Sequence, residues 1–274
     1  MSFTAALDAA ARRARSLLCV GLDPEPARFP GAWRNDPARI YDFCAAIVDA
    51  THDLVCAFKP QFAHFAAHGA EPQLERLIAH VRAVAPGVPV ILDAKRGDIG
   101  STAEMYAREA FVRYRADAVT LSPFLGLDSI EPYMRHAGRG LILLCRTSNP
   151  GGADLQGQAL AEGELLYERI ARLAAGPWKA RAGESELGLV VGATYPRELA
   201  RVRELAPTLP LLVPGVGAQG GDARATVQAG WRPDGPIVVS SSRAILYAGA
   251  GEGFAAAARA AAEDARAQLE AGRP

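Results

Sequence analysis

The apolar run Val88–Leu92 (VPVIL) leads directly into the charged segment Asp93–Asp98 (DAKRGD). A short run of β-branched and aliphatic residues of this kind is typical of a buried strand. A helical stripe of apolar residues between Leu74 and Val81 precedes it, and Pro86-Gly87 ends that helix. The segment therefore predicts one helix–strand unit of an alternating α/β fold, with charges gathered at the end of the strand.

Seven further apolar runs lie on both sides of this one, and each is separated from the next by a helix-length segment. With Val88–Leu92, the runs that we expect to be strands are Leu17–Leu22, Leu54–Phe58, Ala118–Leu121, Leu141–Cys145, Leu187–Val191, Leu209–Val213 and Ile237–Val239. Apolar strands flanked by helices predict a parallel sheet with both faces covered. Eight such units in 274 residues favour a closed (β/α)8 TIM barrel of the α/β class, with a doubly wound sheet as the alternative.

We expect one domain over residues 1–274, because no linker, repeat or low-complexity tract interrupts the alternation. An N-terminal helix is predicted at about residues 2–15, and the Ala-rich tail Phe254–Leu269 predicts a last amphipathic helix. The longest insert, about residues 149–186, follows the fifth strand as a loop, with a helix expected at Leu160–Leu173. Its length suggests a mobile loop at the active site.

The composition limits the partners and the compartment. Half of the residues are hydrophobic and 22% are charged, which predicts a well-cored globular protein rather than a disordered one. Thirty basic residues balance thirty acidic ones, so neither a nucleic acid nor a membrane surface is an expected partner. The four cysteines form no CxxC pair, and the N-terminus lacks the apolar stretch of a signal peptide. We expect reduced, buried cysteines and a cytoplasmic location.

Charged residues follow three consecutive predicted strands, at the positions where a barrel presents its catalytic side chains. Asp23 follows the first strand, Lys59 the second, and Asp93, Lys95 and Asp98 the third. Alternation along a strand puts Asp93 and Lys95 on one face. Carboxylates beside a lysine stabilise its ammonium form, which suits a proton donor better than a Schiff-base nucleophile. The alternative is a surface ion-pair cluster with no chemical role.

A glycine-rich segment, Pro214–Asp222, follows the seventh strand and contains a literal GxGxxG. It lies late in the chain, and Ser240-Ser241 stand where a dinucleotide fold needs an acidic residue, so we do not expect NAD binding. In a barrel, the loops after strands seven and eight form the usual phosphate site. Ser242 and Arg243 at the end of the eighth strand suit forked phosphate contacts. Together the two loops predict a phosphomonoester ligand, although Arg243 alone would equally fit an ordinary surface arginine.

The fifth strand ends in Arg146–Pro150 (RTSNP), whose hydroxyl and amide groups suit either the edge of a polar ring or a simple turn. The five histidines show no metal-ligand spacing, so we expect helix-surface or loop roles for them and no metal.

These segments together resemble the orotidine 5′-phosphate decarboxylase family. Asp93–Ile99 (DAKRGDI) followed by Thr102 is similar to the family's Asp-x-Lys-x-x-Asp signature. The other strand ends and the glycine loop fall in the family's order, from about residue 19 to about residue 247. The length and the Phe-Lys-Pro-Gln and Thr-Ser-Asn-Pro-Gly segments resemble the bacterial type 2 subgroup. The short signature alone is shared with magnesium-dependent sugar-phosphate decarboxylases and synthases.

The resemblance implies a reaction without a cofactor, the conversion of orotidine 5′-phosphate to UMP in pyrimidine biosynthesis. It implies that Lys95 protonates the C6 carbanion within a charged array of Lys59, Asp93 and Asp98. It also implies a homodimer in which Asp98 and Thr102 reach the partner's site.

For the nucleotide, the resemblance implies that Asp23 and Lys59 hold the ribose and Ser148 the pyrimidine. The residues that we expect at the phosphate are Gln219, Gly220, Ser242 and Arg243. Arg146 departs from the expected small or apolar residue. The alternatives that remain are a magnesium-dependent relative and a non-catalytic phosphosugar-binding barrel.

Overall fold

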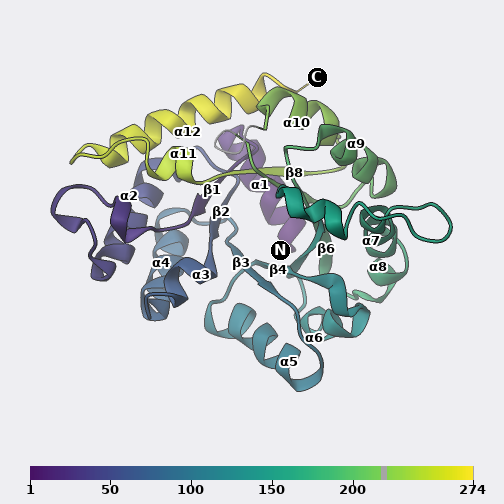
Figure 1. The fold of residues 1–274 in the computed structure, drawn as a ribbon. Coiled ribbons are helices and arrows are strands. Elements are labelled where there is room, and N and C mark those ends of the chain that lie inside the picture. Colours follow the sequence, from purple (N-terminus) through teal and green to yellow (C-terminus); the bar gives the residue numbers. More distant parts are fainter. Residues whose placement is uncertain (217–220, 274) are drawn as a thin grey trace.

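The computed structural model describes residues 1–216 and 221–273. Its eight strands form one parallel sheet in the order β2-β1-β8-β7-β6-β5-β4-β3. The strands are β1 Leu18–Leu22, β2 Ala57–Pro60, β3 Ile91–Arg96, β4 Ala118–Leu121, β5 Gly140–Arg146, β6 Glu186–Val191, β7 Leu211–Pro214 and β8 Ile237–Ser241. Parallel bridges from Phe58 to Val90 and from Gln61 to Asp93 join the two edge strands. The sheet is therefore a nearly closed barrel, as the sequence predicted, and helices surround it (Figure 1).

Helices alternate with the strands and cover the outside of the barrel. The longer ones are α2 Ile40–Thr51, α4 Glu71–Val84, α5 Gly100–Arg108, α7 Leu166–Ala175, α9 Pro196–Leu205, α10 Ala223–Gly230 and α12 Phe254–Glu270. The shorter ones are α3 Phe62–Ala66, α6 Glu131–Met134, α8 Pro177–Arg181 and α11 Arg243–Leu246. In α4 the predicted stripe of Leu74, Leu77, Ile78 and Val81 is the buried face. The tail helix α12 begins where the Ala-rich pattern begins and ends one residue beyond it.

The helix α1 (Phe3–Ala14) lies across one end of the barrel (Figure 1). Its Phe3 and Leu7 belong to the apolar cluster that fills the barrel interior, together with residues such as Ile91 and Ile142. Gly140 leaves room for this plug, since a Cβ there would lie 2.4 Å from the Phe3 ring. This end of the barrel is therefore packed, and the opposite end, at the carboxyl ends of the strands, is left for a site.

The segment after β5 contains the expected helix, but this helix begins later and lies beside further regular structure. Besides the helix α7, residues 149–186 contain a 3₁₀ turn at Pro150–Asp154, the helix α8 and the first residue of β6, so less of the segment is loop than expected. The helix expected from Leu160 begins at Leu166, since Ala159 pairs with Leu165 in an antiparallel bridge and the chain between them turns back. Glu162-Gly163 in that stretch belongs to the turn, and Gly163 has a φ of +81°.

Strand limits also differ from the apolar runs by up to several residues. β2 extends to Pro60 and β3 to Arg96, so Lys59 and Lys95 belong to strands rather than following them. No helix in the described ranges is long and apolar enough to span a bilayer.

Candidate active site

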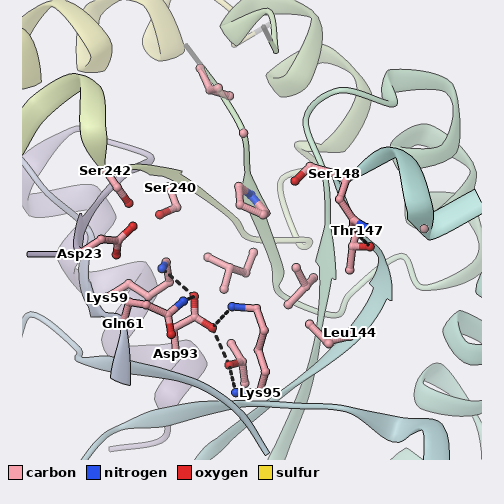
Figure 2. A pocket seen from close by; sticks show the side chains of 18 of the residues that line it. Asp23, Lys59, Gln61, Asp93, Lys95, Leu144, Thr147, Ser148, Ser240 and Ser242 are labelled. Atoms are coloured by element: carbon pink, nitrogen blue, oxygen red, sulfur yellow. Dashed lines mark hydrogen bonds and ion pairs between the residues drawn. The ribbon is translucent and has the colours of Figure 1, made fainter. Parts of the chain in front are cut away.

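A cavity of about 650 Å³ opens at the carboxyl ends of the strands. Its lining comes from the ends of β1 to β8 and from the segment after β5. The residues predicted from the sequence that line it are Asp23, Lys59, Asp93, Lys95, Ser148, Ser242 and Arg243. Figure 2 shows the charged side chains on one side of this cavity and Thr147 and Ser148 on the other. Seven side chains from five different strand ends and their following loops thus meet in one place.

Asp93 is the centre of the charged side. Its Oδ2 accepts hydrogen bonds from Lys59 Nζ at 2.8 Å and from Gln61 Nε2 at 3.1 Å. Its Oδ1 accepts from Lys95 Nζ at 2.6 Å and from the Thr120 hydroxyl at 2.8 Å. Both carboxylate oxygens are therefore used, and one carboxylate lies between two ammonium groups.

The two ammonium groups differ in exposure. The Lys59 side chain is 5% exposed, whereas that of Lys95 is 46% exposed and lines the open cavity. The chain has only three lysines among its thirty basic residues, and two of them are here. This matters chemically, because a lysine ammonium can give up a proton, whereas an arginine guanidinium does not do so in proteins.

Burial and charge act against each other in this array. Burial raises the pKa of Asp93, but the ammonium groups of Lys59 and Lys95 outweigh it and hold that pKa well below its usual range. Burial lowers the pKa of Lys59, yet the carboxylates of Asp93 and Asp23 bring it above its ordinary value. Lys59 and Asp93 are therefore both ionised across the neutral pH range.

Asp23 lies next to this array at the end of β1. Its Oδ1 is buried and has no hydrogen-bond partner among the described residues. A buried carboxylate oxygen without a donor is costly in free energy. The geometry therefore leaves an acceptor open for a hydroxyl or amide donor from a ligand in the cavity.

The opposite side of the cavity is formed by the segment after β5. Gln156 holds this segment, since its Oε1 accepts from the Thr147 N–H at 2.8 Å and its Nε2 donates to the Thr147 hydroxyl at 2.9 Å. Arg146 is buried behind it, with its guanidinium 3.8 Å from the centre of the Tyr195 ring. Arg146 also donates to the Thr147 carbonyl at 3.3 Å. Through these contacts with Tyr195 and Thr147, Arg146 stabilises this side of the cavity.

The third side of the cavity contains the ends of β7 and β8. Gly215, the first glycine of the GxGxxG pattern, has a φ of +100°, a left-handed conformation that favours glycine. Ser242 and Arg243 line the cavity from the start of α11, and Gly21 on the neighbouring β1 makes room, since a Cβ there would overlap the Ser242 hydroxyl. The predicted phosphate residues Gln219 and Gly220 lie outside the described residues.

Asp98 and Thr102 do not join the array within this chain. The Asp98 side chain accepts a hydrogen bond from the Ile99 N–H at 2.8 Å, and Thr102 is exposed on α5. The carboxylate beside Lys95 is therefore Asp93 alone among the described residues, and the expected pair of flanking carboxylates does not form within one chain.

Several polar lining residues were not predicted as site residues from the sequence, among them Gln61, Thr120 and His64. Gln61 and Thr120 both contact Asp93, and the Nδ1 of His64 lies 3.0 Å from the Pro24 carbonyl oxygen. Gln61 lies two residues beyond Lys59 and Thr120 lies in the fourth strand, so their positions at strand ends were a usable signal. Gln61 and Thr120 are uncharged, so the charges that mark the ends of the first three strands do not point to them.

Residues 1–216 and 221–273 contain no group of three or more His, Cys, Asp or Glu side chains arranged to hold a metal ion.

Residues 16–260 match the model of the family described as "Orotidine 5'-phosphate decarboxylase / HUMPS family". Proteins named orotidine 5'-phosphate decarboxylase from Paracidovorax citrulli and Variovorax paradoxus are 71% and 68% identical to the chain, over 100% of both sequences in each case. The structure of Leishmania donovani OMP decarboxylase superposes with a TM-score of 0.84 at 41% identity, covering 100% of this chain and 99% of that one. By sequence and by fold, this chain belongs to the orotidine 5′-phosphate decarboxylase / HUMPS family.

Proposed function

We propose that this protein converts orotidine 5′-phosphate to UMP without a cofactor, in de novo pyrimidine biosynthesis, and that Lys95 protonates C6 of the pyrimidine. The observation that carries the proposal is the Lys95 ammonium, which lines the cavity and lies 2.6 Å from the buried carboxylate of Asp93. The chain is a carboxy-lyase, as its full-length relatives at 71% and 68% identity are.

The reaction demands strong stabilisation of charge. Orotidine 5′-phosphate has no carbonyl group placed to take up the electron pair that CO₂ leaves at C6, so the site must stabilise a carbanion directly. Enzymes lower barriers by roughly 8–23 kcal/mol, and this reaction calls for the upper part of that range. The ammonium of Lys95 then serves twice, as the cation that faces the developing charge and as the acid that delivers the proton.

Repulsion between Asp93 and the substrate carboxylate contributes less. Two charges about 4 Å apart interact by about 4 kcal/mol at an effective dielectric constant of 20. Asp93 is also compensated by two ammonium groups and two further donors, which reduces its field at the substrate. In this proposal Asp93 and Lys59 mainly hold Lys95 in place, and preorganised charge accounts for most of the rate.

The rest of the nucleotide fits the other sides of the cavity. The open acceptor on Asp23 suits a ribose hydroxyl, with Lys59 beside it, and the Ser148 segment opposite suits the polar edge of the pyrimidine. We place the phosphate at the ends of β7 and β8, where Ser242 and Arg243 lie. Gln219 and Gly220 complete this phosphate site in the proposal.

We further propose that the protein acts as a homodimer in which Asp98 and Thr102 complete the partner's site. Exposed apolar side chains occur in and next to α5, which carries Thr102, and in the turn after β4, where Phe124, at 76% exposure, is the most exposed of them. The others in this region are Ile99, Met105, Val112 and Leu125. We infer that these side chains form one apolar patch, which is typical of a protein interface. Mixing Lys95→Ala subunits with Asp98→Ala subunits should restore turnover that neither variant shows alone, whereas a mixture that stays inactive contradicts the shared site.

We place the enzyme in a single barrel domain and in the cytoplasm. All four cysteines are free and buried, and burial raises the pKa of the Cys19 thiol to about 12. Such thiols persist in a reducing compartment.

The deciding experiment is the loss of orotidine 5′-phosphate absorbance after purified, EDTA-treated protein is added. Turnover in EDTA supports the proposal. Turnover that needs added Mg²⁺ favours the magnesium-dependent relatives. Nucleotide binding without release of CO₂ favours a binding barrel.

A further inference from the structure

The backbone at Lys95 departs from a regular strand. Along β3 and β4, Ile91 pairs with Ala118 and Leu92 with Val119, but the next pair is Arg96 with Leu121. Three residues of β3 therefore lie opposite the single residue Thr120. Within this bulge Lys95 has a φ of +47°, the left-handed region that a lysine seldom adopts. Backbone of this kind persists only where its surroundings hold it, and it is concentrated at functional sites.

Thr120 holds the bulge on the side of the cavity. Its hydroxyl accepts a hydrogen bond from the Lys95 N–H at 3.0 Å and donates to Asp93 Oδ1 at 2.8 Å. One hydroxyl thus links the main chain of Lys95 to the carboxylate that its ammonium contacts.

Arg96 holds the bulge on the outer side. Its guanidinium lies 4.4 Å from the centre of the Phe62 ring and 4.4 Å from the centre of the Tyr106 ring. Its Nε and Nη2 donate to Glu109 Oε2 at 3.1 and 2.8 Å. The Arg96 carbonyl accepts from the Ser122 N–H at 2.7 Å, where pairing with β4 resumes. The side chain is thus held by two rings and a carboxylate, and its main chain by a ladder bond.

We propose that Arg96 is a positioning residue for the reaction: its clamp on Phe62, Tyr106 and Glu109 fixes the end of the bulge and so aims the Lys95 ammonium at the cavity. Arg96 itself does not line the cavity, so it acts through Lys95. The inference rests on the proposed role of Lys95 as the proton donor. Its physical basis is that a misplacement of about 1 Å can lower a rate by about 100-fold.

The test is Arg96→Met, which keeps an unbranched apolar stem between the rings but removes the charge and the donors. We expect kcat to fall by about 10–100-fold, since the ammonium loses its fixed placement. KM for orotidine 5′-phosphate and the affinity for UMP should change by less than about 3-fold, because the substitution removes no contact between the protein and the nucleotide. Arg96→Lys restores the cation without the flat, forked contacts and should give an intermediate kcat.

Arg139→Met is the matched control. Arg139 also contacts a carboxylate, Asp117 at 3.3 Å, a carbonyl, that of Ala116 at 2.9 Å, and a ring, that of Phe111 at 5.9 Å. It precedes β5, at the opposite end of the barrel from the cavity. Both Met variants should lower the melting temperature, but only Arg96→Met should lower kcat. An equal loss of kcat in both, or full kcat in Arg96→Met, would overturn the proposal.

The clamp should also act as a unit. Glu109→Gln should lower kcat in the same way, and the double variant Arg96→Met/Glu109→Gln should be no slower than Arg96→Met alone. Additive losses would contradict a shared clamp. Lys95→Ala separates the two proposals: if it keeps turnover, the proton donor is wrong. If it abolishes turnover while Arg96→Met keeps full kcat, only the positioning role fails.

Discussion

Lys59 and Arg203 are both cations buried in this barrel, at its opposite ends, and they are neutralised differently. Lys59, 4% exposed, lies at the carboxyl end of β2 and pairs with the carboxylate of Asp93 at 2.8 Å. Arg203, 1% exposed, lies in α9, and its guanidinium donates to six main-chain carbonyls at 2.7–3.1 Å. No carboxylate among the described residues pairs with Arg203.

The two environments have different consequences. The carbonyls around Arg203 belong to the end of α9, the end of α10 and the segments that lead into β7 and β8. They are those of Ala206, Pro207, Leu209, Gly230, Gly235 and Pro236. They use all five of its N–H donors, so nothing remains for a ligand. Burial lowers the pKa of Arg203 to about 10, which still leaves it charged at neutral pH. At the carboxyl ends of the strands, by contrast, the Asp93 carboxylate is shared between the ammonium groups of Lys59 and Lys95, and the Lys95 ammonium stays open to the cavity. A buried cation surrounded by carbonyls thus holds the fold together, whereas one that shares a carboxylate can hold a reactive neighbour in place.

The largest expected effect tests the charged array at the carboxyl ends of the strands. Lys95→Ala should lower turnover by about 10⁴-fold or more, because it removes both the acid and the cation that faces the carbanion. The melting temperature and the binding of UMP should be retained, as a thermal melt and calorimetry would show. Lys179→Ala, at the exposed third lysine on α8, is the control and should keep full activity. Substantial remaining turnover in Lys95→Ala would refute its assignment.

The next largest effect tests Arg203, at the other end of the barrel. Arg203→Met should lower the free energy of unfolding by about 3–5 kcal/mol, since it leaves several buried carbonyls without donors. Protein that remains folded should keep its kcat/KM, measured below the melting transition. Arg203→Lys keeps the charge and three donors and should lose less stability, which covers the case in which the Met variant does not fold. A loss of kcat without a loss of stability in Arg203→Lys would break the comparison.

A third effect concerns Arg243, an arginine that lines the cavity. Arg243 is exposed and lines the cavity, unlike Arg203, so Arg243→Ala should leave stability unchanged. Its kcat/KM should fall by about 10–100-fold, through a higher KM and a lower kcat, because binding energy from the phosphate is used in the transition state. Arg197→Ala, at an exposed position on α9, is the matched control. Unchanged steady-state kinetics in Arg243→Ala would remove this residue from the phosphate site.

The smallest effect is the pH dependence of stability. The folded pKa of Asp93 is lowered, so the stability that it contributes is present above its unfolded value of about 3.9 and is lost as the pH falls towards the lower folded value. The difference in melting temperature between the wild type and Asp93→Asn should therefore be constant at pH 5–7 and should shift against the wild type below about pH 4. A difference that stays the same down to pH 3 would show that the pKa of Asp93 is not lowered.

Much of the architecture was predictable, because the pattern that carries it is local. Eight apolar runs separated by helical stripes predicted the barrel, and the rule that a barrel's site lies at the carboxyl ends of its strands placed Asp23, Lys59, Asp93 and Lys95 in one cavity. The limits of the strands and the start of α7 were less predictable, since turns and ladder pairing shift them by several residues.

The sequence by itself determined the order of the strands and the kinds of side chain at their ends, because hydrophobic periodicity and residue identity are properties of the local chain. Only the tertiary structure decided which of these groups meet. Gln61 reaches Asp93 across 32 positions of sequence, Lys95 takes a left-handed backbone inside a bulge, and Arg203 collects carbonyls from segments up to 33 positions away. Asp98, three residues from Lys95, stays apart from it. Hydrogen bonds and ion pairs depend on distances of a few tenths of an ångström, and only the packing of distant segments sets such distances.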